Sequence, residues 1–224
     1  MGVVSDAQPP DGFDALLKRF SGEVVDYQFF AFAGDESGGP PSIDTLRLVA
    51  QRTIELVAER YCPPGKRRGT ESITEFYGID VVRLSGHTPR LVGWDEFLGP
   101  EWSGPEPSVI GDHLTYRRAF KYPPYHYKVA KLPPPASRGW KDFLLGPKPP
   151  PFEAESTAEC KRLSIMLLEM AIGEKIGSDQ VMIWEWPTDW AHWFEAGHEW
   201  WGAACWTIWT RPDRFVGIVA SATD

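Results

Sequence analysis

Two histidines and two glutamates near the end of the chain are residue types that could bind a metal ion. They are His192, Glu195, His198 and Glu199. On a helix, the first, second and fourth of these share one face, and zinc accepts imidazole and carboxylate ligands. The segment HEWWG that starts at His198 lacks the second histidine of an HExxH motif, and Gly197 is expected to end the helix before it. We therefore expect no metal, only polar side chains on the wet side of a short helix.

Three carboxylates are the residues best suited to act as a general acid and a general base. Glu185, Asp189 and Glu195 lie among tryptophans, and paired carboxylates can divide the roles of general acid and general base. A hydrolase with a tryptophan-lined cleft is therefore one alternative. No serine stands in a GxSxG elbow, and the glycine-rich stretch 34–39 lacks the pattern of a phosphate-binding loop. We expect no catalytic residue and no cofactor.

Tryptophan is concentrated in one stretch of the chain. Eight of the eleven tryptophans lie between Trp184 and Trp209. Their spacing places Trp184 and Trp186 on one face of a strand, and Trp190 and Trp193 on one face of a helix. Eight indoles exceed what one sheet face can hide, so we expect five or six in the core and the rest at the surface.

The acidic short helix in this stretch is the predicted contact surface. Exposed indoles beside carboxylates are typical of hot spots for a protein partner, and they can also stack on sugars. The predicted partner-binding residues are Asp189, Trp190, Trp193, Glu195 and Glu199. A carbohydrate-binding module is the second alternative.

Hydrophobic periodicity and turn residues predict the elements that position these side chains. Helices are expected at 13–20, 43–61, 94–98, 153–176 and 190–196, and strands at 23–33, 74–84, 109–120, 181–186, 199–210 and 215–222. Ser42 is the expected N-cap of the second helix, and Gly177 the residue after the fourth. The last two strands form a hairpin, with 215–222 as a central strand of the sheet.

These elements predict a single α+β domain over residues 1–224. Its sheet is mainly antiparallel and packs with two main helices. Residues 1–10 are expected to be a loose tail. Residues 121–151 are expected to be a basic, proline-rich insert on the surface with one helical turn at 140–145, because proline lacks an N–H and cannot continue a central strand.

Charge is unevenly distributed along the chain. The net charge is −8 overall, −7 over residues 1–110, +6 over 111–150 and −7 over 151–224. An acidic body does not suit nucleic acid, whose phosphates need clustered Lys and Arg, but it suits a basic protein partner. The three cysteines show neither metal spacing nor a disulfide framework. With no secretion signal and no apolar run long enough for a membrane span, the expected location is the cytoplasm.

The −8 charge, the tryptophan-rich C-terminal hairpin and the lack of an active-site motif carry a resemblance. In general style the chain resembles the immunity proteins that neutralise bacterial polymorphic toxins. Those are commonly small, acidic, cytosolic α+β proteins without catalytic residues. The resemblance implies a non-catalytic module whose acidic, aromatic surface blocks a basic toxin or enzyme, and it assigns no individual site residue.

Overall fold

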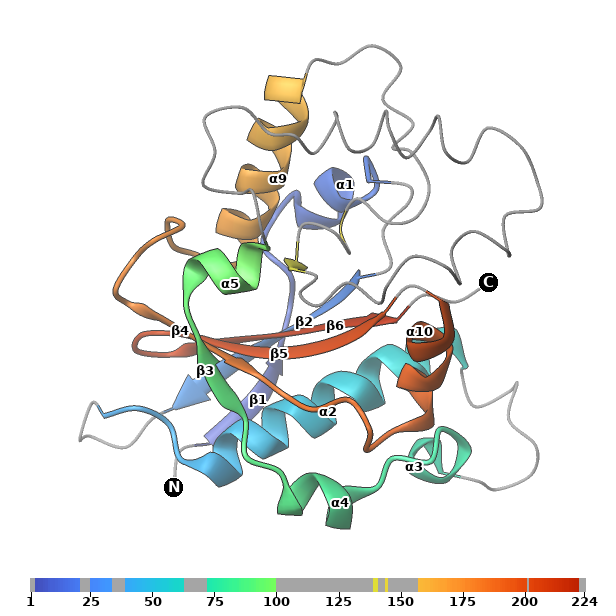
Figure 1. Cartoon of the computed structure of the whole chain (residues 1–224). Helices are drawn as coiled ribbons and strands as arrows, with labels where there is room; N and C mark the ends of the chain where they lie inside the picture. Colours follow the sequence, from blue (N-terminus) through green and yellow to red (C-terminus); the bar gives the residue numbers. More distant parts are fainter. Residues whose placement is uncertain are drawn as a thin grey trace, which may run out of the picture.

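A six-stranded antiparallel sheet runs through the middle of the molecule (Figure 1). The computed structural model describes residues 3–20, 25–33, 39–62, 72–99, 139–140, 144, 157–200 and 202–221. The strands are β1 (Val3–Ala7), β2 (Val25–Ala33), β3 (Arg90–Val92), β4 (Val181–Glu185), β5 (Ala203–Thr210) and β6 (Arg214–Ser221). Their order across the sheet is β1-β2-β6-β5-β4-β3, and every neighbouring pair is antiparallel.

Helices cover both faces of this sheet. The helical elements are α1 (Phe13–Leu17), α2 (Ile43–Tyr61), α3 (Ile73–Phe76), α4 (Val81–Gly86), α5 (Trp94–Leu98), α9 (Thr157–Ile172), the 3₁₀ turn η2 (His192–Phe194) and α10 (Glu195–Trp200). The two long helices lie on opposite faces, with α9, α1 and α5 above the sheet in Figure 1 and α2, α3, α4 and α10 below it. The α+β fold with two main helices is confirmed.

Alternation along the strands creates a separate hydrophobic core on each face. On β5, Trp206 and Ile208 belong to the core under α9, whereas Cys205 and Trp209 belong to the core over α2. This is the period of two that a strand buried on both faces must show. The predicted C-terminal hairpin is confirmed, and β6, third in the strand order, is the expected central strand.

Helix α2 begins where its cap predicts. Ser42 Oγ accepts a hydrogen bond of 3.2 Å from the Thr45 backbone N–H. Thr53, farther along the helix, is fully buried against β6, where Gly217 leaves it room. A Cβ added at Gly217 would lie 1.8 Å from Thr53 Oγ1, so only glycine permits this close approach of helix and sheet.

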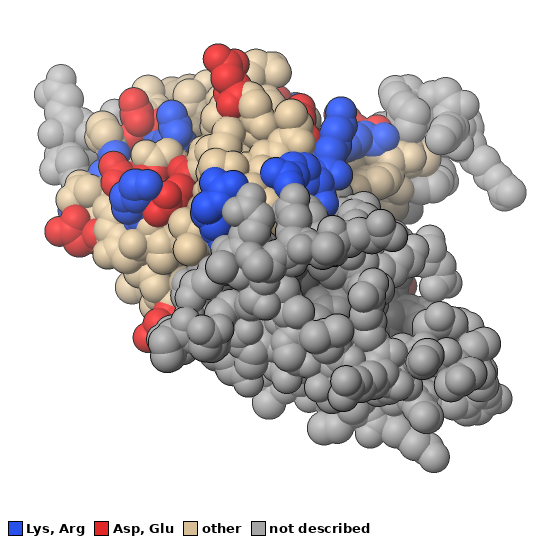
Figure 2. Space-filling view, turned by 90° about the horizontal axis from the view of Figure 1, so that it is seen from above, with Lys and Arg blue, Asp and Glu red and all other residues tan. Residues whose placement is uncertain are grey.

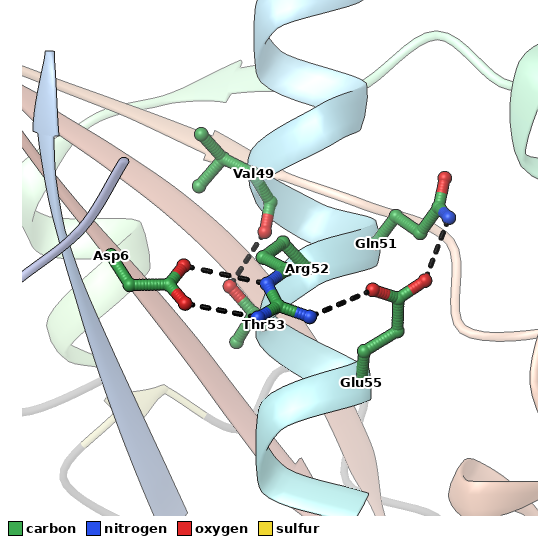
Figure 3. Close-up of polar contacts among 6 residues, drawn as sticks. All are labelled: Asp6, Val49, Gln51, Arg52, Thr53 and Glu55. Atoms are coloured by element: carbon green, nitrogen blue, oxygen red, sulfur yellow. Dashed lines mark hydrogen bonds and ion pairs between the residues drawn. The ribbon is translucent and has the colours of Figure 1, made fainter. Parts of the chain in front are cut away.

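The N-terminal segment is a strand and not the loose tail expected from its sequence. β1 pairs with β2 from Val3↔Ala33 to Ala7↔Phe29. Asp6 on this edge strand accepts two hydrogen bonds from Arg52 of α2, of 2.9 and 3.4 Å (Figure 3). Backbone pairing and this two-point ion pair order a polar segment whose own sequence shows little strand character.

The predicted strand at 74–84 is wrong, because this segment forms helices α3 and α4. Side chains that cap helix ends override the β-branched residues here. Ser72 and Glu75 exchange backbone-to-side-chain hydrogen bonds of 2.8 and 3.2 Å at the start of α3. Asp80 Oδ1 accepts a 2.8 Å bond from the Arg83 N–H at the start of α4. Gly78, with φ 54°, connects the two helices.

Within the proline-rich insert, the structure describes only Gly139, Trp140 and Leu144. Trp140 and Leu144 are helical, as expected, but both are fully buried in the core under α9. The Trp140 indole donates a 2.8 Å hydrogen bond to the Tyr27 hydroxyl and stacks on Phe97. The insert is therefore anchored in the core at this point and does not lie wholly on the surface. The strand expected at 109–120 falls outside the described residues.

Two glycines have other roles than those predicted. α9 ends at Ile172, and Gly173 with φ 73° follows it, so Gly177 is not the helix stop. The helix expected at 190–196 is η2 followed by α10, which continues through Gly197. A Cβ at Gly197 would lie 2.4 Å from the Gly202 carbonyl oxygen, so close packing accounts for this glycine. Among the described residues, no helix is both long and apolar enough to cross a membrane.

Candidate functional site

Two of the predicted contact residues, Trp190 and Trp193, have buried indoles. Trp190 is 1% exposed, and its Nε1 donates a 2.6 Å hydrogen bond to the Pro187 carbonyl. Both rings pack edge-to-face on Phe194. These two tryptophans therefore hold the segment in place, and neither presents its ring to a partner.

The other tryptophans of the stretch follow the same pattern. Six of the eight are buried, namely Trp184, Trp186, Trp190, Trp193, Trp206 and Trp209. This agrees with the expected five or six core indoles. The structure describes neither the Trp200 side chain nor Trp201, so the exposed remainder of the prediction falls outside what is described.

Asp189 is partly exposed and contacts an arginine of α4 and the histidine that follows this helix. Its carboxylate oxygens lie 2.7 Å from Arg83 and 2.8 Å from His87 Nε2. The His87 carbonyl in turn accepts a 3.1 Å bond from Arg47 of α2. The carboxylate therefore joins the loop after β4 to α4 and is paired with the Arg83 guanidinium.

Glu195 extends into solvent at the start of α10. Its Oε1 lies 3.8 Å from His192 Nε2, and both side chains are about 70% exposed. Glu199 belongs to α10, but its side chain is not among those described. The predicted set thus contains one exposed carboxylate, one ion-paired carboxylate and two buried indoles.

Backbone contacts fix this segment against the loop between α3 and α4. The Asp80 N–H donates to the Trp190 carbonyl at 2.7 Å, and the His192 N–H donates to the Tyr77 carbonyl at 3.0 Å. Gly78 lies under the His192 ring, and a Cβ there would come within 2.5 Å of Nδ1. The tryptophan-rich segment and the α3–α4 region therefore form one surface.

This surface contains exposed aliphatic residues that the sequence reading did not single out. We name residues 80–92 the α4–β3 edge, because they run from α4 into β3 at the end of the sheet (Figure 1). Val82 of α4 is 82% exposed and Leu91 of β3 is 56% exposed, and Val81 is also exposed. Asp80 is a residue type that caps helices, so the sequence contains a signal for α4. The strand predicted at 74–84 gave no indication that Val81 and Val82 face solvent.

Ion pairs lie on the same segment, with the Arg90 group on the opposite face of the sheet from Leu91. Arg90 of β3 forms an ion pair with Glu185, its register partner on β4. Its Nη1 also lies 2.5 Å from Glu96 Oε1 of α5. Residues 80–99 and 185–195 together contain six acidic side chains and two arginines, a net charge of −4 with histidine neutral. On the face seen in Figure 2, acidic and basic side chains are interspersed over the described part.

Two of the three carboxylates considered for hydrolysis are paired with arginine. Glu185 is bound by Arg90 and Asp189 by Arg83, so each carboxylate already has a cationic partner. Burial, with a smaller contribution from the negative charge of Glu185, raises the pKa of the Cys205 thiol well above its ordinary value, which suppresses the nucleophilic thiolate. Within the described part of the chain, no three His, Cys, Asp or Glu side chains are grouped closely enough to hold a metal ion.

No family model matches the chain, and neither a curated protein nor a solved structure is significantly similar to it.

Proposed function

We propose that the protein is a non-catalytic protein-binding module, specifically an immunity protein that neutralises a cognate, basic bacterial toxin in the cytoplasm. The observation that carries this proposal is the α4–β3 edge with its exposed aliphatic side chains. The segments 80–99 and 185–195, to which these side chains and their neighbours belong, have a net charge of −4. An apolar centre with a charged rim is the usual composition of a protein interface. An acidic field accelerates the approach of a basic partner.

The two alternatives have less support. A carbohydrate-binding module needs indole faces open to solvent, and six tryptophans of the stretch are buried. A hydrolase needs carboxylates in contrasting environments, and Glu185 and Asp189 are both paired with arginine. The burial of Trp190 and Trp193 also changes the proposed contact chemistry from aromatic to aliphatic and acidic.

Binding to the product of the adjacent gene tests the proposal. We expect the two proteins to co-purify, with a Kd in the nanomolar range by calorimetry. The affinity should fall at least tenfold between 50 and 300 mM salt, because charge attraction is screened. Co-expression should also protect cells from the neighbouring protein. If the two proteins form no complex at low salt, the proposal is wrong.

A further inference from the structure

β1 forms one edge of the sheet, and its outer side is open. The strand order ends at β1, and among the described residues its backbone pairs with β2 alone. Natural edge strands usually avoid pairing with other chains through short length, charged side chains, proline or a bulge. β1 has five residues in unbroken register with β2 and contains no lysine, arginine or proline. β3, the opposite edge, has three residues and contains Arg90.

The backbone groups of Val4 and Asp6 point out of this edge. The Phe32 N–H donates to the Asp213 carbonyl at 2.7 Å, so Phe32 directs its backbone groups to the β6 side and away from β1. Residues of an antiparallel pair alternate between hydrogen-bonded and non-hydrogen-bonded positions. Phe32 is the register partner of Val4. Val4 and Asp6 therefore occupy non-hydrogen-bonded positions opposite β2, and their N–H and C=O groups face outward.

We infer that two copies of the chain pair through β1, antiparallel about a twofold axis at Ser5. This register places Val4 of each copy opposite Asp6 of the other, so each such pair exchanges two backbone hydrogen bonds and no outward group of either residue is left over. A register centred on Val4 would pair only that one of the two residues within β1. A register centred on Asp6 would oppose two carboxylates of like charge. The edge is thus self-complementary, as the contact of a twofold dimer must be.

The side chains on both faces suit this pairing. Val3, Ser5 and Ala7 are uncharged and lie on the face of α9, where Ala7 packs against the core. In the Ser5 register, Val3, which is 66% exposed, lies opposite Ala7 of the second copy. On the face of α2, Asp6 is the only charged residue of β1, and Arg52 of the same chain binds both of its carboxylate oxygens (Figure 3). The contact therefore opposes no unpaired charges, although each copy has a net charge of −8.

Sedimentation of the full chain over a range of concentrations tests the inference. At about 0.15 M salt, repulsion between distant charges of the two acidic copies is screened, whereas charges closer than about 8 Å still interact. The contact is small, so we expect monomer and dimer in exchange with a Kd in the micromolar range. NMR amide shifts between dilute and concentrated samples should be confined to β1 and its neighbours on β2 and α2. A chain that stays monomeric at millimolar concentration, or shifts at another surface, would overturn the inference.

Opposite charges at Ser5 test the register. The twofold axis places Ser5 against itself at a non-hydrogen-bonded position, where side chains lie closest. Ser5→Asp and Ser5→Lys should each raise the Kd at least tenfold, because like charges then face each other. An equal mixture of the two variants should restore the dimer. If each variant alone dimerises like the wild type, or if the mixture stays monomeric, the β1 pairing is wrong.

Two controls separate this register from a general effect of charge or of folding. Ser5→Thr keeps the position neutral, and Ser85→Asp adds the same charge at an exposed serine of α4. Both should dimerise like the wild type, and a Ser85→Asp chain that loses the dimer would place the contact elsewhere. Circular dichroism and the β1 amide signals verify that every variant folds.

The dimer does not depend on the proposed function. A β1 dimer without any complex with the adjacent gene product would retain this inference and reject the immunity function. A toxin complex formed by a chain that never dimerises would do the reverse.

Discussion

At the scale of single residues, Asp26 on β2 is a carboxylate that the fold buries. Arg60 approaches it at 3.0 Å, and the Tyr61 hydroxyl donates to it at 3.1 Å, both from the end of α2. Burial nevertheless raises the pKa of Asp26, since the loss of water around the charge outweighs the attraction to Arg60 and the hydrogen bond from Tyr61. Asp26 therefore links β2 to α2, although ionising its buried carboxyl group costs free energy in the folded protein.

Asp26 should therefore make the protein more stable as the pH falls. The folded chain binds this proton more tightly than the unfolded chain, whose ordinary pKa is 3.8. The stability linked to this group is thus fully present below the unfolded pKa and is lost as the pH rises through the folded pKa. Asp26→Asn cannot titrate, so the variant should gain stability relative to the wild type as the pH rises from 4 to 7. Urea unfolding at both pH values measures the change.

The control for this prediction is Val3→Thr, which changes an exposed side chain without adding or removing a titratable group. Its stability difference from the wild type should stay constant between the two pH values. An equally constant difference for Asp26→Asn would contradict the account of Asp26.

At the scale of elements, the packing of α2 on the sheet depends on glycine. Thr53 directs its hydroxyl to the Val49 carbonyl at 2.7 Å, and this turn of the helix rests on β6 at Gly217. The helical period of α2 and its cap at Ser42 are visible in the sequence. The need for glycine at 217 is not, because Thr53 and Gly217 meet only when helix and strand are packed together.

Gly217→Ala should destabilise the protein by about 1–3 kcal/mol, the usual cost of forcing a methyl group into a packed interior. Either β6 or α2 must shift, because the new methyl would overlap the Thr53 side chain. Gly86→Ala is the control, since a Cβ there meets nothing within 4 Å, and its effect should stay within about 0.5 kcal/mol. Chemical denaturation compares the two variants, and equal effects would refute the packing argument.

At the scale of the whole molecule, one sheet separates two hydrophobic cores. The upper core contains α9 and the Trp140 anchor, and the lower core contains α2 and most of the tryptophan-rich stretch. β2, β5 and β6 contribute side chains to both cores, so neither core is complete without the strands that build the other.

This shared sheet predicts a single cooperative unfolding transition. Leu167→Ala in the upper core and Ile54→Ala in the lower core should each cost about 2–5 kcal/mol, since both side chains are fully buried. Tryptophan fluorescence, to which the lower core contributes five indoles, and far-ultraviolet circular dichroism should report the same midpoint in each variant. Separate midpoints would mean that the two cores unfold independently.

Much of the fold is predictable from local sequence, because spacing and capping act within a few residues. The hairpin of β5 and β6, the start of α2 at Ser42 and the opposite faces of Trp206 and Trp209 all follow from neighbouring residues. The strand prediction for segment 74–84 is wrong because local signals conflict there. Its valines favour a strand, whereas Ser72 and Asp80 cap helices.

The sequence by itself determined the α+β class, the antiparallel hairpin and the acidic net charge. Only the tertiary structure decided which side chains face water. Burial depends on what distant parts of the chain cover, and no periodicity records it. The stretch richest in tryptophan therefore lies mostly in the core, while Val82 and Leu91 remain exposed at the edge of the sheet. The proposed contact residues therefore lie at that edge of the sheet and not among the indoles.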